Sequence, residues 1–329
     1  MRTIMAVMGD TLRSLCQRRL FWVHCWSSLA VVLFFAGMGF HDGGWHAFFG
    51  LKSFPNPQLS PGTPWEHSLH CWVLSRLARW WVAGGSLGLA LFCCASVMPR
   101  TLDQGAAALY LPKVRRRSSL LLGRFFGGLV YAGLVTLLVT GGLFLAAGLR
   151  MGQWLPQLFW NVPLALLLFA PLYGMSMLLG VVTRSSTAAL LVALLFAGSV
   201  WALHSSVKES RQKAALLAAG VDHDDEDKAS GLSESLGGEI MNKAAVVLPD
   251  ASRFLDWQEE ESCPRPAVTY RDLFRRMRPS RRGAPASGSP LEAVPAGRPP
   301  EIFTDILTTL ALTAGTVAAA LGLLRRRDL

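Results

Sequence analysis

Apolar residues in this chain are gathered into long runs separated by polar segments. Six stretches contain no Asp, Glu, Lys or Arg, and each has at least 18 residues: 20–40, 80–98, 125–149, 158–182, 185–207 and 306–324. A helix needs about 20 apolar residues to cross the roughly 30 Å hydrocarbon core of a bilayer. The pattern therefore predicts an all-α polytopic membrane protein with about six transmembrane helices.

Composition supports the same class. Hydrophobic residues make up 51% of the chain and charged residues only 16%, whereas soluble domains carry about 25% charged residues. Tryptophans also lie near the ends of the apolar runs, where an amphipathic ring favours the headgroup region. They are Trp22, Trp80, Trp81, Trp154, Trp160 and Trp201. Lipid, not water, is the solvent that this composition fits.

Basic residues predict the orientation. With the amino terminus in the cytoplasm, the basic clusters 13–19, 113–117 and 325–327 all fall on the inner side, as the positive-inside rule favours. The short outer loops then hold Lys52, Arg76, Arg79 and Arg150. The chain has a net charge of +10, and much of this positive charge lies where anionic lipid headgroups are expected. We therefore expect no nucleic-acid partner. We predict a multi-pass protein of a bacterial plasma (inner) membrane with both termini cytoplasmic.

A helix precedes the first span. Within residues 3–19, Ile4, Met8, Leu12 and Leu15 recur at helical spacing, which predicts an amphipathic helix lying in the inner membrane interface. The alternative is a cytoplasmic helix whose apolar stripe packs on a partner.

The long segment between the last two spans divides the chain into three parts. We predict a transmembrane domain at 1–206, an extracytoplasmic loop at 207–300, and a sixth span with a short tail at 301–329. The loop begins with a helical stretch over 207–219. Its end is rich in Pro, Gly, Ser and Arg, which predicts disorder over 278–300.

Sequence motifs of nucleotide-binding proteins and of enzymes are missing or weak in this chain. The chain has no G-x-x-x-x-G-K-[ST] loop, so it cannot bind ATP by that route, and any ATPase must be a separate chain. Residues 84–88 match the letters of G-x-S-x-G, but they lie in an apolar helix, where small residues favour close helix packing. We expect no nucleophile paired with a base, no catalytic residue, no metal and no cofactor.

Three further features of the apolar runs bear on mechanism. Gly123 with Gly127, and Gly315 with Ala319, have the spacing of tightly packed helices or of a dimer seam. No carboxylate lies in the centre of a run, which argues against a proton-coupled transporter. His24 is either a functional group or a residue that simply faces water or a neighbour.

The inner segment between the second and third runs is the most informative. Thr101 or Asp103 can cap a short helix that ends at Leu111, because Pro112 stops it. A basic patch follows and would anchor the next span at the lipid headgroups. Its residues are Lys113, Arg115, Arg116 and Arg117.

This segment resembles the permeases of type-2 ABC exporters, a family that includes the nitrous-oxide-reductase maturation permease. The family pattern is an aspartate or arginine before Gly, a helix ending near L-x-K-P-V-x-R, and then L-L-x-G-[KR]-x-x-G. Matching residues are 103–105, 109–116 and 121–127, and the likeness continues at 172–176, 179–185 and 325–328. The chain differs in placing Pro112 before Lys113, and 263–300 has the character of an insertion.

The resemblance implies a permease that pairs with a second copy of itself or with a sister chain. It also implies that separate ABC ATPase subunits dock on 101–111. We expect the contact to be made by Leu102, Asp103, Gly105, Leu109 and Tyr110. The alternative function is a membrane subunit that transports nothing and transmits ATPase motion to an extracytoplasmic partner.

Overall fold

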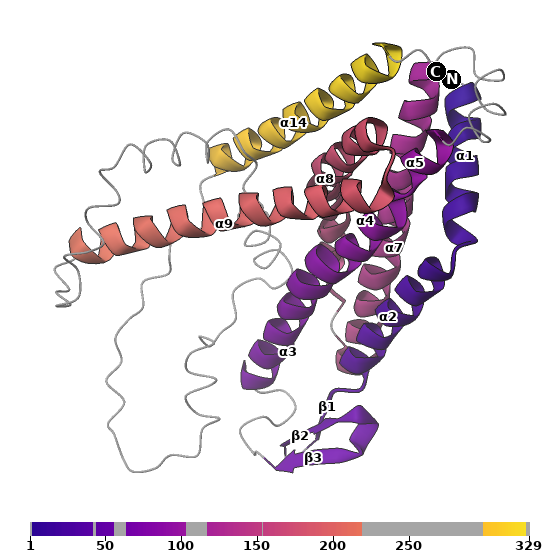
Figure 1. Ribbon diagram of the computed structural model, residues 1–329. Coiled ribbons are helices and arrows are strands. Elements are labelled where there is room, and N and C mark those ends of the chain that lie inside the picture. Colours follow the sequence, from indigo (N-terminus) through magenta and orange to yellow (C-terminus); the bar gives the residue numbers. More distant parts are fainter. Residues whose placement is uncertain are drawn as a thin grey trace.

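The computed structural model describes residues 2–41, 44–55, 64–102, 117–152, 154–218 and 299–326 (Figure 1). Helices dominate this part of the chain. In order, they are α1 (Arg2–Cys16), α2 (Arg19–Ala36), α3 (Pro64–Leu77), the π-helix η3 (Ala78–Ser86), α4 (Leu87–Ala95), α5 (Val97–Leu102), α7 (Arg117–Met151), the 3₁₀ helix η4 (Pro156–Trp160), α8 (Asn161–Thr183), α9 (Ser186–Ala218) and α14 (Pro299–Arg326).

In the described part of the chain, five helical stretches are long and apolar enough to cross a membrane. They are Arg19–Ala36, Trp72–Pro99, Ser118–Leu149, Pro156–Thr183 and Thr304–Leu324. Each overlaps one of the predicted spans. The remaining predicted span, 185–207, lies in α9, whose shorter apolar part is Ser186–Val200. The chain is an all-α multi-pass membrane protein, and the proposed sixth crossing by α9 stays a prediction.

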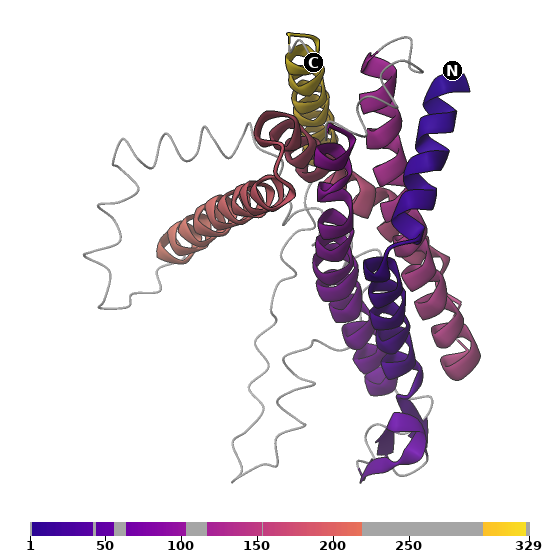
Figure 2. The same ribbon diagram turned by 45° about the vertical axis from the view of Figure 1, so that its right-hand side comes forward.

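The start of α1 and the end of α14 lie at one end of the bundle, which we call the termini end (Figures 1 and 2). A small antiparallel sheet of three strands lies at the opposite end, the sheet end. Its strands are β1 (Gly39–His41), β2 (Gly44–Ala47) and β3 (Lys52–Pro55), in the order β1-β2-β3, with the 3₁₀ turn η1 (Phe48–Gly50) between the last two. The apolar pattern did not predict this sheet.

The long helix α7 organises the bundle. Its 35 residues span about 52 Å, which exceeds the hydrocarbon thickness. Helix α1 packs along its beginning and α2 along its middle, in parallel register: Val7 contacts Gly123, Thr11 contacts Gly127 and Val32 contacts Gly142. A helix is therefore present where the amphipathic one was predicted, and α7 of the same chain packs on its side formed by Ile4, Val7 and Thr11. Its position in the membrane interface stays a prediction.

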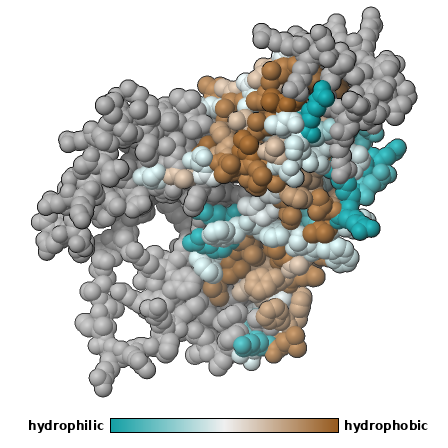
Figure 3. Space-filling model, in the orientation of Figure 1, coloured by the Kyte–Doolittle hydropathy of each residue, from teal (hydrophilic) through white to brown (hydrophobic). Residues whose placement is uncertain are grey.

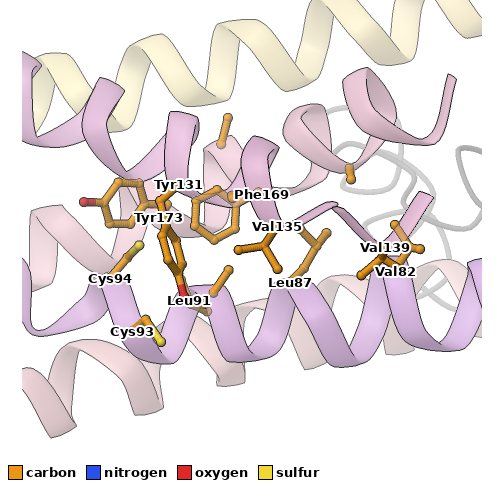
Figure 4. Packing of buried hydrophobic residues seen from close by; sticks show 14 of the residues in the cluster. Val82, Leu87, Leu91, Cys93, Cys94, Tyr131, Val135, Val139, Phe169 and Tyr173 are labelled. Carbon is orange, nitrogen blue, oxygen red and sulfur yellow. The ribbon is translucent and has the colours of Figure 1, made fainter. Parts of the chain in front are cut away.

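Aromatic and aliphatic side chains fill the space between α4, α7 and α8 (Figure 4). Tyr173 of α8 stacks on Phe125 of α7, with 5.8 Å between ring centroids, and on Phe169, at 5.3 Å. Leu91 of α4 and Val135 of α7 are buried in the same cluster. These three helices form the core on which the others pack.

Apolar side chains also remain exposed along the helices (Figure 3). On α2 the exposed set lies on one side of the helix: Trp22, Val23, Trp26, Leu29, Leu33 and Phe34. A soluble monomer rarely exposes so continuous an apolar surface, whereas a helix in lipid requires one. The exposed faces agree with the membrane class.

Two boundaries differ from the predicted ones. The helical stretch predicted at 207–219 is the continuation of α9, which runs without a break to Ala218. Disorder was predicted to end at about Pro300, and the structure begins α14 at Pro299, so both prolines lie in its first turn, where a proline costs no helical hydrogen bond. Residues 278–298 lie outside the described part of the chain.

Gly127 gives the first testable prediction. A Cβ added there would lie 2.7 Å from Cβ of Thr11, so Gly127→Val should push α1 away from α7 and lower the free energy of unfolding by about 1–3 kcal/mol. Gly141→Val is the matched control on the same helix, because a Cβ at Gly141 meets no described residue within 4 Å. Thermal unfolding of the detergent-solubilised protein measures both. Equal melting temperatures for the two variants would show that α1 does not depend on this close contact.

Candidate functional site

The predicted ATPase-docking segment lies almost entirely outside the described residues. Of its residues, the structure places Thr101 and Leu102, which end α5. Asp103, Gly105, Leu109 and Tyr110 fall in the undescribed stretch 103–116, as do Lys113, Arg115 and Arg116, and Arg117 is the first residue of α7.

Thr101 lies inside α5 and is buried, and its hydroxyl donates to the carbonyl of Met98 at 2.7 Å. A cap at Thr101 or at Asp103 would accept hydrogen bonds from N–H groups outside the described residues, so both caps stay predictions.

Both ends of the stretch 103–116 are nevertheless fixed by packing. On the side before it, Pro99 of α5 closely approaches α8: a Cβ at Gly180 would lie 3.2 Å from Cδ of Pro99. On the side after it, α7 begins at Arg117 and is covered by α1. The helices on both sides of the stretch are therefore packed against other helices of the described chain.

A buried arginine holds α1 on α7. Only 4% of the Arg124 side chain is exposed, its Nη2 lies 3.2 Å from Oδ2 of Asp10, and its Nη1 donates to the hydroxyl of Thr11 at 3.2 Å. The carbonyl of Arg124 accepts a hydrogen bond from the hydroxyl of Tyr173 at 3.2 Å. A guanidinium supplies several donors in a rigid plane, so one side chain can join two residues of α1. We call Asp10, Thr11 and Arg124 the arginine clamp.

A second arginine links the junction between α1 and α2 to the end of α4. Nη1 of Arg18 donates to the carbonyl of Cys93 at 3.0 Å and to the hydroxyl of Ser96. The last carbonyls of a helix lack partners within the helix and carry partial negative charge, which a cation there satisfies. The beginning of α2 is thereby fixed to the second membrane-spanning stretch.

Deeper in the bundle, three polar side chains from three helices meet. His24 of α2 has Nε2 3.0 Å from the hydroxyl of Ser86 of η3 and Nδ1 3.4 Å from the hydroxyl of Tyr131 of α7. All three side chains are buried. His24 therefore faces neighbouring helices and not water. We call His24, Ser86 and Tyr131 the histidine cluster.

The histidine cluster revises two expectations from the sequence. The expectation that no nucleophile could be paired with a base is wrong, because Ser86 and His24 lie within hydrogen-bonding distance. Among the described residues, a Cβ at Gly84 or Gly88 meets nothing within 4 Å, so the packing interpretation of residues 84–88 has no support at these two glycines within the chain. Ser86 itself is 1% exposed, so no substrate atom can reach its hydroxyl in this arrangement.

Glycine positions predicted to pack closely have different outcomes. Gly123 and Gly127 do permit close packing, and α1 occupies that face within the same chain. Gly315 has nothing within 4 Å of an added Cβ. The sequence spacing alone did not distinguish the two cases.

Comparison with known proteins adds no family to this description. The chain matches no protein-family model and no curated protein. Its class rests on the fold: apolar helices that can cross a membrane, with the buried Arg124 joining α1 to α7 and the half-buried Arg18 joining the junction of α1 and α2 to the end of α4.

Proposed function

We propose that this chain is the permease subunit of an ATP-binding-cassette exporter, driven by separate ATPase subunits that dock on residues 101–111. The observation that carries the proposal is where the family-like residues lie. The stretch 121–127, which resembles the L-L-x-G-[KR]-x-x-G pattern, supplies Gly123, Arg124 and Gly127, and these are the residues that hold α1 against α7. The resemblance thus falls on residues with a specific packing role.

Position along the chain supports a mechanical role for the segment 101–111. It joins α5, which packs on α8, to α7, which is clamped to α1. A push on this segment would move α7 and α1 together. Because α7 is about 52 Å long, the movement would reach the sheet end of the bundle.

The proposed subunit works as a dimer, with a second copy or with a sister permease, in the inner membrane of a bacterium. The exposed apolar face of α2 supports contact with lipid or with another membrane helix. The basic residues 113–117 support a cytoplasmic position for the termini end, next to anionic lipid.

Cysteine labelling tests this orientation. A cysteine introduced at Ala107 should be protected from a membrane-impermeant maleimide added to intact cells, whereas one at Gly231 should react, because the two positions fall on opposite sides in the proposed topology. The native cysteines are removed first, and permeabilised cells provide the control for reactivity at Ala107. Labelling of the Ala107 site from outside in intact cells contradicts the proposed docking role.

One observation favours the alternative, a subunit that transports nothing and moves an extracytoplasmic partner. Helix α9 has 33 residues and a length of about 50 Å, and its apolar part ends at Val200. Its remainder can form a rigid arm that leads into the segment 219–298. Both functions require a bound ATPase, but only an exporter moves a substrate into inside-out vesicles when ATP is added.

A further inference from the structure

The turn that joins β2 to β3 carries exposed apolar side chains. Phe48, Phe49 and Leu51 are 55%, 63% and 90% exposed. Five of the residues in 39–55 are aromatic, a share well above the 10% of the whole chain. Turns that face water are normally built from small and polar residues. The composition of this turn therefore fits an apolar surrounding better than it fits water.

The backbone of the turn adopts a conformation that suits smaller residues. Phe48 has a φ of 52° and Phe49 a φ of 58°, so both lie in the left-handed region. Gly, Asn and Asp enter this region readily, whereas a bulky side chain there costs conformational energy. Burial inside the chain does not offset that cost, because both rings are more than half exposed. A contact outside the chain would offset it.

Contacts with α2 place the turn at the end of a spanning stretch. The N–H of Phe49 donates to the carbonyl of Gly37, the residue that follows α2, at 2.9 Å. The Phe48 ring packs edge-on against the Phe34 ring, with 6.1 Å between ring centroids. Phe34 belongs to the stretch Arg19–Ala36, which can cross a membrane. The turn is therefore held where this stretch leaves the hydrocarbon.

The ring of Phe48 also continues the exposed apolar side of α2. Phe34 is 48% exposed and lies at the sheet end of the row that begins at Trp22 (Figure 1). In a membrane-spanning helix such a side faces lipid. Aromatic and large aliphatic side chains also favour the boundary between acyl chains and headgroups. Continuity with a lipid-facing side identifies lipid as the surrounding of the turn.

We propose that the turn 48–51 inserts into the lipid of the membrane at the sheet end and anchors the three-stranded sheet there. Insertion removes Phe48, Phe49 and Leu51 from water, which offsets the conformational cost of the left-handed backbone. Because the turn is joined to α2 through Gly37, the anchor also fixes the end of α2 relative to the bilayer. The inference uses only the membrane class of the fold and is independent of the proposed exporter function.

Photo-crosslinking in the native membrane identifies what surrounds the turn. Phe49 is replaced by p-benzoylphenylalanine, which keeps an aromatic ring, and the full-length chain is irradiated in its own membranes. The expected product is a chain whose mass has increased by one phospholipid. The same replacement at Phe34 is the reference for a lipid-facing site on α2. A crosslink from position 49 to a second copy of the chain or to another polypeptide overturns the proposal, as does the absence of a lipid adduct.

A second set of variants tests whether the two phenylalanines hold the turn in lipid. The photo-reactive residue is placed at Leu51, and Phe48→Asn and Phe49→Asn are introduced together, because Asn enters the left-handed region readily and preserves the turn. Loss of two apolar side chains should lower the yield of the lipid adduct about tenfold. Phe48→Trp with Phe49→Trp is the matched control and should keep the yield near that of the parent chain, because the apolar area remains. Equal yields from the Asn and Trp variants overturn the proposal.

Discussion

Replacing Leu109 and Tyr110 together with Asp is expected to abolish association with the ATPase while membrane insertion stays intact. Both residues fall on one face of the helix predicted over 101–111, with Leu102 and Ala106. A helix that inserts an apolar face into a groove loses its affinity when two carboxylates must be desolvated there, and buried aromatics such as Tyr110 commonly carry much of the interface energy. Co-purification of the ATPase with the tagged chain measures the loss.

The control for this double substitution uses one aromatic residue and one leucine at the sheet end. Phe48 and Leu51 are 55% and 90% exposed, and they lie on the opposite side of the membrane in the proposed topology. Changing both to Asp adds the same charge to an aromatic residue and a leucine, and it should leave the ATPase bound. Normal recovery of the ATPase with the Leu109 and Tyr110 variant would remove the docking role from 101–111.

The second large effect is expected at the arginine clamp. Arg124→Gln removes the ion pair to Asp10 and weakens the bond to Thr11, and it should lower the free energy of unfolding by about 1–3 kcal/mol. In the proposed exporter it should also leave the ATPase bound but fail to convert hydrolysis into transport, because α1 no longer moves with α7. Thermal unfolding, co-purification and ATP-dependent transport in vesicles separate these effects.

Two variants sharpen the Arg124 experiment. Arg13→Gln changes an exposed arginine on α1 and should alter stability by less than about 0.5 kcal/mol. Exchanging the charges, with Asp10→Arg and Arg124→Asp in one chain, should restore part of the lost stability if the ion pair matters. If Arg124→Gln unfolds at the wild-type temperature and transports normally, the clamp has no mechanical role.

The spanning helices could be predicted from sequence because bilayer thickness fixes their length. The charge-free runs predicted where the five long apolar helical stretches lie, but they did not predict where the helices begin and end. The third run begins at Phe125, whereas α7 begins at Arg117. The predicted run stopped at Arg124 because that residue is charged. In the structure Arg124 is buried and paired with Asp10, so the helix continues through it and extends beyond the apolar region.

The polar contacts could not be predicted because they join residues far apart in sequence. His24 is 62 residues from Ser86 and 107 from Tyr131, and no local spacing marks them as neighbours. The contacts of Arg18 and Thr11 could not be predicted either. Each residue is ordinary for an amphipathic helix, and its role depends on a partner helix that the sequence does not reveal. The π-helix η3 carries no sequence signal either, because its residues also suit an α-helix. Tertiary packing alone brings these groups together.

The central claim is that a separate ATPase drives this chain, and photoaffinity labelling tests it most directly. The tagged chain is purified from its native membrane in mild detergent and irradiated with an azido-ATP analogue. The account predicts that the label appears on a distinct, co-purifying polypeptide, that excess ATP prevents it, and that this chain stays unlabelled. Recovery of the chain with no ATP-binding partner, or labelling of the chain itself, would contradict the account.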